Sequence, residues 1–225
     1  MVIKRIKQVV ELVLLIFLAP VFLSLVLTIF YILIPPLSMP IVGSFLSGQE
    51  THWRWRSYDE ISPHLKRAVI AAEDGRFCEH NGVDWIAVEK VANKAARKGR
   101  LSRGASTIPM QTAKNLFLWP LPDLLRKPLE IPLATWMDAM WSKRRMLEIY
   151  LNIAQFGNGI YGAEAASRFY FKKSASQLNI NEASALAAIL PNPEKRNPER
   201  LTSKIANYAI TIKARSGSSR TSCLK

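Results

Sequence analysis

Residues 62–77 read SPHLKRAVIAAEDGRF. Ser62 and Pro63 predict the start of a helix, because a serine hydroxyl can cap the first turn and proline fits the first helical position. The apolar side chains that follow recur every three or four residues, at Leu65, Ala68, Val69 and Ala72. This spacing predicts a helix with one buried face that ends at two carboxylates.

The two carboxylates at the end of this helix are Glu73 and Asp74. Glu73 falls at the border of the buried face, and the dipole of a helix is negative at its C-terminus. Partial burial and the dipole both raise the pKa of a carboxylate, which suits a general base. The residues alone leave one alternative open, a solvated acidic pair at a frayed helix end.

The rest of the chain continues the helical pattern and predicts a mainly α protein without internal repeats. Helices are expected from about Asp84 to Arg97, from near Thr107, from about Lys127 towards Trp141, from Ser142 through Asn152, and from Gly159 to Phe171. Asn179 and Glu182 resemble a capping box, which predicts a further helix up to Leu190. Strand signals are sparse, apart from the alternating residues 52–56.

Residues 12–34 carry no charge. A helix of this length spans about 35 Å, enough to cross a hydrocarbon core of roughly 30 Å. Basic residues before it place residues 1–11 in the cytoplasm, so we expect a transmembrane helix over 12–34 with the body outside the cytoplasmic membrane. A cleaved signal peptide or a buried core helix is the alternative, although the apolar run exceeds a signal h-region.

The body is strongly basic. The formal net charge is +14, of which residues 1–11 supply little, so an anionic partner is expected: nucleic acid, an acidic membrane surface or a phosphorylated substrate. A position outside the cytoplasmic membrane weakens the first. We divide the body into a linker over 35–57, one folded domain over 58–198 and a basic tail over 199–225, predicted to be poorly ordered.

Cysteine, histidine and apolar residues give three smaller predictions. Cys78 and Cys223 form no C-x-x-C pair, and we interpret them as two unpaired thiols, with a bridge between them as the alternative. His80 lacks a partner at zinc spacing and is interpreted as a structural histidine beside the base. Part of the apolar segment 116–122 is predicted to be exposed for contact with a membrane, with core packing as the alternative.

Five spaced groups of residues resemble the motifs of glycosyltransferase family 51. They are Glu73 to Phe77 with His80, Gly82 and Asp84; Gly104 to Ile108 with Gln111, Lys114 and Asn115; Arg126, Lys127 and Glu130; Tyr150 to Asn152, Phe156, Gly157, Tyr161, Gly162, Ala165, Ala166, Tyr170 and Phe171; and Leu178, Glu182, Ala183, Leu186, Ala187, Pro191 and Pro193. The resemblance covers about Ser62 to Pro198. With a short anchor and no penicillin-binding domain, the chain is similar to the monofunctional branch.

The resemblance implies a lysozyme-like glycosyltransferase domain over 58–198, with a larger globular lobe and a small membrane-proximal jaw lobe behind one transmembrane helix. It implies an enzyme of the bacterial inner membrane, with its catalytic domain in the periplasm, that polymerises lipid II into β-1,4-linked glycan strands. The reaction inverts the donor sugar and releases undecaprenyl pyrophosphate. Lipid II, the growing glycan, membrane lipids and other cell-wall synthesis or division proteins are the expected partners; nucleic acid is not.

The resemblance also implies roles for single residues. Glu73 matches the catalytic base, and Glu130 matches the second essential glutamate, near the donor pyrophosphate. Residues matching the substrate-binding positions are Asp74, Phe77, His80, Ser106, Thr107, Gln111, Lys114, Asn115, Arg126 and Lys127. Cations such as Lys114 and Arg126 can stabilise the negative charge of a departing pyrophosphate. The family also leaves room for Mg²⁺ or Mn²⁺ at the pyrophosphate, but the sequence shows no ligand set.

The chain departs from the family pattern at three places. Pro109 and Met110 stand where a hydroxyl residue and a first glutamine are usual, Pro122 stands where many members have arginine, and the tail after Pro198 does not resemble the usual closing helix. Two other functions are kept as alternatives. One is a lysozyme-like lytic enzyme, which needs no pyrophosphate site and is disfavoured by the basic second motif; the other is a non-enzymatic membrane-anchored scaffold.

Overall fold

A computed structural model describes residues 8, 18–98, 104–218 and 221–224 of the chain. It contains two compact units, Met1–Ile34 and Pro35–Lys225. In the first, residues 18–30 are helical. The hydroxyls of Ser24 and Thr28 donate to backbone carbonyls three residues earlier, at 2.7 and 2.6 Å, so this apolar helix satisfies its own polar side chains.

The predicted transmembrane span is only partly covered by the described residues, because residues 12–17 lie outside them. Among the helices that are described, none combines the length and the apolar character that a membrane crossing needs. The span over 12–34 therefore stays a prediction.

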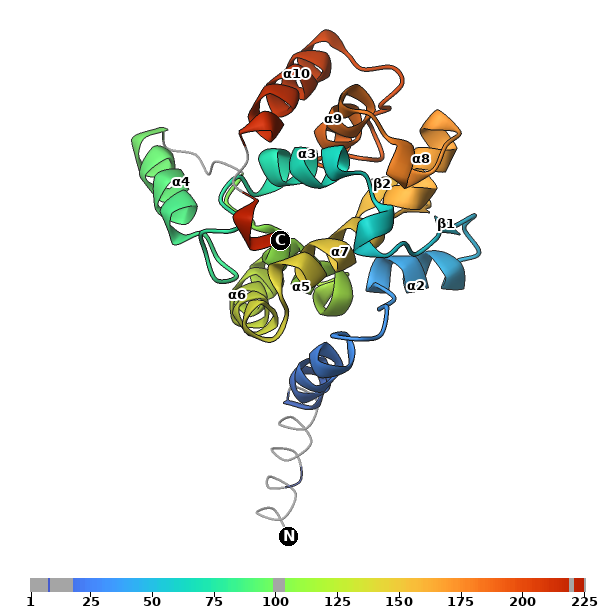
Figure 1. The fold of residues 1–225 in the computed structure, drawn as a ribbon. Coiled ribbons are helices and arrows are strands. Elements are labelled where there is room, and N and C mark those ends of the chain that lie inside the picture. The colour runs from blue at the N-terminus through green and yellow to red at the C-terminus, as the bar shows by residue number, and fades with distance from the viewer. Residues whose placement is uncertain (1–7, 9–17, 99–103, 219–220, 225) are drawn as a thin grey trace. The chain divides into compact units, whose positions relative to one another are not determined.

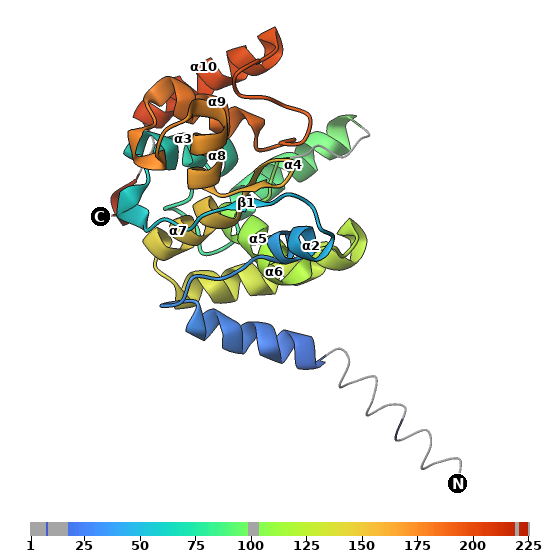
Figure 2. The same ribbon diagram turned by 90° about the vertical axis from the view of Figure 1, so that its right-hand side faces the viewer.

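Three helices pack together at one end of the second unit. They are α3 (Pro63–Glu73), α9 (Ile180–Ile189) and α10 (Ser203–Gly217), which stay grouped in both views (Figures 1 and 2). The predicted starts of α3 and α9 are confirmed. The Ser62 hydroxyl accepts from His64 N at 3.2 Å, and the Asn179 side chain accepts from two backbone amides of the first turn of α9.

The prediction of a poorly ordered tail is wrong for residues 203–217, which form α10. Ala209 and Ile212 of this helix are buried, while the residues between them face outward. A narrow apolar stripe at helical spacing was hidden by a basic, serine-rich composition. The tail is thus part of the cluster that holds α3.

A second group of helices lies on the other side of α3. It comprises α5 (Ile108–Ala113), its continuation η2 (Lys114–Leu118), a single π-helical turn, and then α6 (Asp123–Met140) and α7 (Lys143–Ile153), with α4 (Trp85–Lys98) beside them (Figure 1). The helices predicted over 84–97, from 107 and over 142–152 are confirmed. α6 begins four residues before Lys127, because Pro122 takes the N-cap, where no helical amide is needed.

The described residues also form one small sheet, of β1 (His52–Trp53), β3 (Ile160–Tyr161) and β2 (Gln155–Gly157) in that order. β1 runs parallel to β3, and β2 antiparallel. The helix predicted from Gly159 is therefore shorter, since α8 (Ala163–Phe171) begins after Gly162. Gly162 has φ 82°, and a Cβ there would lie 2.6 Å from Asn152 O, so only glycine fits this turn.

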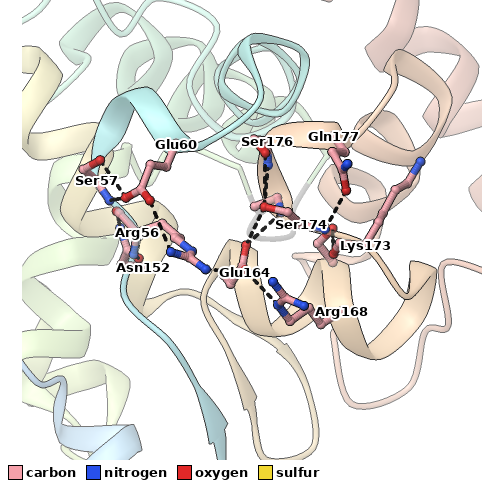
Figure 3. A network of polar contacts seen from close by, with 12 residues as sticks. Arg56, Ser57, Glu60, Asn152, Glu164, Arg168, Lys173, Ser174, Ser176 and Gln177 are labelled. Carbon is pink, nitrogen blue, oxygen red and sulfur yellow. Dashed lines mark hydrogen bonds and ion pairs between the residues drawn. The ribbon is translucent and has the colours of Figure 1, made fainter.

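The predicted linker over 35–57 is partly structured, with α2 (Met39–Leu46) and β1 inside it. Its last residues are tied to α8 by a buried ion network (Figure 3). The Glu164 carboxylate, with no exposed side-chain surface, accepts from Arg56 Nη2 at 3.0 Å, Arg168 Nε at 2.6 Å and Ala175 N at 2.8 Å. Burial alone would raise the pKa of Glu164, but these donors lower it to about 2.

The interpretation of Cys78 and Cys223 as unpaired thiols is wrong, because the structure joins them in a disulfide with a Cα–Cα distance of 5.6 Å. After α10, the short helix η4 (Ser222–Leu224) packs against α7, and its Cys223 reaches the loop that follows α3. Leu224 is buried there. The bridge closes a separation of 145 residues, which local sequence patterns cannot reveal.

Candidate active site

Glu73 is the last residue of α3 and lies partly buried against α5. Its Oε2 accepts a hydrogen bond from Gln111 Nε2 at 2.8 Å, and Gln111 Oε1 in turn accepts from the Tyr150 hydroxyl at 3.0 Å. Burial raises the pKa of Tyr150 well above its ordinary value, so its hydroxyl stays a donor. The tyrosine therefore fixes which end of the Gln111 amide faces the carboxylate.

The charge state of Glu73 is tuned by opposing effects. Burial raises its pKa, while the hydrogen bond from Gln111 and the ammonium of Lys114 lower it in part, and the net direction is upward. A carboxylate whose pKa is raised binds a proton more readily than a solvated one. This property suits a general base.

The neighbouring Asp74 links the end of α3 to the start of α5 through buried hydrogen bonds. Its carboxylate accepts from His80 Nε2 at 2.8 and 3.0 Å and from Ile108 N, at the start of α5, at 2.9 Å. Asp74 and His80 are buried, and Phe77 is fully enclosed with its ring edge-on to the histidine. These three residues, expected at substrate-shaping positions, contact protein groups and join the end of α3 to α5.

A second set of contacts fixes the loop between α3 and α4. Thr107, the buried N-cap of α5, donates through Oγ1 to Gly82 O at 2.5 Å and accepts from Met110 N at 3.3 Å. Gly82 has φ 85°, and a Cβ there would lie 2.7 Å from Ala134 O of α6. Glycine thus lets the loop approach the helix that carries Glu130.

Glu130 lies on α6 with 1% of its surface exposed, and basic groups engage both of its oxygens. Oε1 pairs with Arg126 Nη1, and Oε2 accepts from Lys127 Nζ at 2.7 Å. Lys127 Nζ also donates to Ser106 Oγ at 2.9 Å, and Arg126 reaches the exposed Asp123. Glu130 is therefore placed to act as a counter-ion that holds two cations on the first turns of α6.

Lys114 connects the two carboxylates electrostatically. Burial lowers its pKa, Arg126 and Lys127 lower it further, and Glu130 opposes them. The same ammonium lowers the pKa of Glu73, so it lies within the field of both glutamates. Among the described residues its ammonium has no hydrogen-bond or ion-pair partner, which leaves it available to an anionic ligand.

A cavity of about 240 Å³ opens beside these groups. Gln111 and Lys114 are three residues apart and Asn115 follows, so the junction of α5 with the π-helical turn presents them on one side. The lining residues are Pro40, Gln111, Lys114, Asn115, Trp119, Tyr150, Ile153, Ala154, Gln155, Tyr161, Leu190, Pro191 and Pro193. The hydrogen-bond partner of the base and the unpaired cation therefore share one cavity.

The described residues do not offer a metal site. In the ranges 18–98, 104–218 and 221–224, no group of three or more His, Cys, Asp or Glu side chains could hold an ion. The Glu130 carboxylate, the natural candidate near a pyrophosphate, is already engaged by two cations. The described residues thus do not fit a resident Mg²⁺ or Mn²⁺.

Two residues near Glu73 were not predicted from the sequence. Arg196 lowers the pKa of Glu73, and its Nη1 donates to Ala188 O at 2.8 Å. Tyr208 of α10 donates to Ala72 O at 3.1 Å. Both lie after α9. Arg196 is not one of the motif residues and Tyr208 lies beyond Pro198, so no local pattern could have assigned them to the site.

The apolar segment after Lys114 is divided between core and surface. Leu116 and Leu118 are buried, whereas Trp119 and Leu121 are about two-fifths exposed. The exposed apolar surface continues onto α6, most of all at Leu124, with 85% of its surface exposed. The prediction of a partly exposed segment is confirmed; its contact with a membrane stays a prediction.

This helical domain has a cavity lined by Lys114 and by Gln111, the hydrogen-bond partner of the partly buried Glu73 carboxylate, and Lys114 lies in the field of the cations of α6. Such an arrangement is typical of enzymes that transfer a group from an anionic donor. The sequence model of the Transglycosylase family matches residues 40–215, most of the chain and most of α10. The chain belongs to this transglycosylase family.

Curated relatives align with this chain over most of their length. Three of them all bear the name biosynthetic peptidoglycan transglycosylase. The protein of Rhodospirillum centenum is 48% identical over 195 residues, which cover 86% of this chain and 84% of that protein. That of Brucella suis biovar 1 is 47% identical over 196 residues, 87% and 86% of the two chains. That of Rhodopseudomonas palustris strain TIE-1 is 45% identical over 212 residues, 94% and 89%.

Proposed function

We propose that this transglycosylase is a peptidoglycan glycosyltransferase that polymerises lipid II into β-1,4-linked glycan strands for cell-wall synthesis. The names of the relatives support the substrate class. The observation that carries the proposal is the position of Lys114, whose ammonium acts on both Glu73 and Glu130 and has no partner among the described residues. A reaction that expels an anionic leaving group next to a general base requires a cation at such a position, because the cation stabilises the departing charge.

In the proposed reaction, Glu73 accepts the proton of the acceptor sugar 4-hydroxyl. The hydroxyl oxygen attacks C1 of the donor sugar from the face opposite the leaving group, so the new bond is formed with inversion. The bond from C1 to the pyrophosphate oxygen breaks, its electron pair leaves with undecaprenyl pyrophosphate, and the negative charge on that group grows. Cations already aimed at this position stabilise the transition state more than the ground state.

Basic residues of η2 and α6 supply that charge stabilisation. Lys114 faces the cavity, and Arg126 and Lys127 are held on α6 by Glu130. Because Glu130 is buried and ion-paired, its role in the proposal is to orient these cations rather than to transfer a proton. Ser106 contributes by fixing the ammonium of Lys127.

We further propose that the protein is anchored by residues 12–34 in the bacterial inner membrane, with the cytoplasmic N-terminus and the periplasmic catalytic domain expected from the basic residues that precede the span. The Cys78–Cys223 disulfide supports this placement, since such bonds persist in oxidising compartments and are rare in the cytosol. Exposed apolar side chains from Trp119 to Leu125, beside the cavity wall, support contact with membrane lipids.

Incubation of the purified full-length protein with labelled lipid II tests the proposal, with gel separation of the products. Polymer that a muramidase can digest supports it. If the protein instead shortens preformed glycan strands, the lytic alternative replaces it; if neither happens in detergent or in vesicles, the scaffold alternative does. A parallel reaction with a chelator tests whether the enzyme needs a divalent cation, and we expect undiminished polymerisation.

A further inference from the structure

Tyr208 holds the end of the helix that carries Glu73. Its hydroxyl donates to the carbonyl of Ala72, the residue before Glu73, at 3.1 Å. Carbonyls in the last turn of a helix have no partner within the helix and must find one elsewhere. α10 packs against both α3 and α9, so this donor comes from a well-supported element rather than from a loose chain end.

Tyr208 also interacts electrostatically with the catalytic carboxylate. Burial raises the pKa of Tyr208, and the Glu73 carboxylate raises it further, whereas Arg196 lowers it. Arg196 also lowers the pKa of Glu73. Glu73, Arg196 and Tyr208 therefore lie within one another's electrostatic fields. The other groups acting on Glu73 are Gln111, Lys114 and Asp74, with Tyr150 within its field.

The C-terminal segment 203–224 contacts the chain around Glu73 at a second point. The disulfide attaches Cys223 to Cys78, five residues after Glu73, while Tyr208 binds one residue before it. The base is thus bracketed by two contacts from one segment. Neither contact involves a residue that lines the cavity, so the segment acts on the base from behind.

We infer that Tyr208 is a positioning residue for Glu73: its hydroxyl fixes the last carbonyl before the base, and its partly buried ring limits the access of water to this end of α3. The inference rests on the proposed role of Glu73 as the base. Tyr208 itself touches neither substrate nor leaving group. Its two parts have separable effects, on the geometry and on the pKa of the base.

The substitution Tyr208→Phe removes the hydroxyl and keeps the ring. We expect kcat for lipid II polymerisation to fall about three- to tenfold, the equivalent of one net hydrogen bond, with KM unchanged. Tyr170→Phe is the matched control, because Tyr170 of α8 also donates to a backbone carbonyl, Phe156 O, at 3.1 Å and is not among the groups that act on Glu73. It should lower the melting temperature to a similar extent and leave kcat unchanged.

The substitution Tyr208→Ala removes the ring as well. Water would then reach this end of α3 more readily, so the pKa of the base should fall towards its ordinary value, and the acidic limb of the pH profile of kcat should move to lower pH. The limb should stay in place in Tyr208→Phe and in Tyr170→Phe. A purely structural role for Tyr208 would change stability without moving this limb.

Two results overturn the inference. One is a Tyr208→Phe protein with the kcat of the wild type and only a lower melting temperature; the other, for folded Tyr208→Ala protein, is an acidic limb that stays in place. Glu73→Gln in the same series separates this failure from that of the proposed function. If Glu73→Gln still polymerises lipid II, the base is assigned wrongly; if only the Tyr208 variants behave as wild type, the base stands and the positioning role falls.

Discussion

The side-chain amide of Gln111 donates to the Glu73 carboxylate at 2.8 Å. This contact joins the end of one helix to the middle of another, and it comes from the motif in which the family usually has two glutamines. With Pro109 and Met110 in the preceding positions, Gln111 alone supplies the amide. Met110 and Pro109 are buried, so the departure from the family pattern affects packing and leaves the contact with the base intact.

Replacement of Gln111 by methionine should raise the pKa of Glu73 further. A hydrogen bond donated to a carboxylate stabilises its charged form, so its loss favours the protonated form. The acidic limb of the pH profile of kcat should move to higher pH, with the largest loss of activity at the acidic end. Gln177→Met is the control, since Gln177 belongs to a capping box away from the site. A limb that moves to lower pH would contradict this account of the base.

Lys114→Met should remove a cation while keeping the length of the side chain. Loss of one preorganised group that stabilises developing charge lowers kcat on the order of 100-fold. Calorimetric titration with inorganic pyrophosphate should show weaker binding as well. Lys94→Met on the exposed surface of α4 makes the same charge change and should alter neither measurement. Equal pyrophosphate affinity in the Lys114 variant and the wild type would remove this lysine from the proposed leaving-group site.

Glu164→Gln should destabilise the fold in a pH-dependent way. The pKa of Glu164 is lowered from its ordinary 4.5 to about 2, so its contribution is fully present above 4.5 and is lost as pH falls towards 2. At neutral pH the contribution is about 3 kcal/mol. Thermal unfolding should show a lower melting temperature for the variant at pH 7 and a shrinking difference below pH 4.5.

The control for this measurement is Glu60→Gln, which contacts the same Arg56 from a side chain that is 52% exposed. Screening by solvent makes such pairs weak, so little change is expected. A destabilisation of the same size in both variants would mean that the network of Figure 3 is not organised around the buried carboxylate.

Reduction of the Cys78–Cys223 bond should lower stability. A cross-link that closes so long a loop contributes about 2–5 kcal/mol by restricting the unfolded chain. Melting temperatures of the wild type should fall on addition of a reductant, to the value of a Cys78→Ser/Cys223→Ser protein, which the reductant should not affect. Two free thiols found in the denatured, non-reduced wild type would show that the bond does not form.

The sequence predicted the elements whose signals are local. Ser62, Thr107, Ser142 and Asn179 each cap the helix that they were expected to start. Glu73 and Gln111 were named and do meet. Helices such as α10, with one narrow apolar stripe in a basic segment, were missed, because composition there resembles that of a disordered tail.

Contacts between residues far apart in the sequence could not be predicted. The disulfide, the contact of Tyr208 with Ala72 and the influence of Arg196 on Glu73 all join the end of the chain to α3, across more than a hundred residues. The state of Glu130 was equally hidden, since its spacing from Arg126 and Lys127 fits either a free catalytic acid or a saturated counter-ion.

The most direct test of the account is the rate of lipid II polymerisation by Glu73→Gln protein, beside Glu89→Gln, a matched change on the exposed face of α4. An amide cannot accept the proton, so kcat should fall by about 100- to 10,000-fold. The variant should remain folded and be at least as stable at pH 7, because ionisation of a carboxylate with a raised pKa costs stability in the folded state. Polymerisation by the folded Glu73→Gln protein at the rate of the Glu89→Gln control would contradict the assignment of Glu73 as the base.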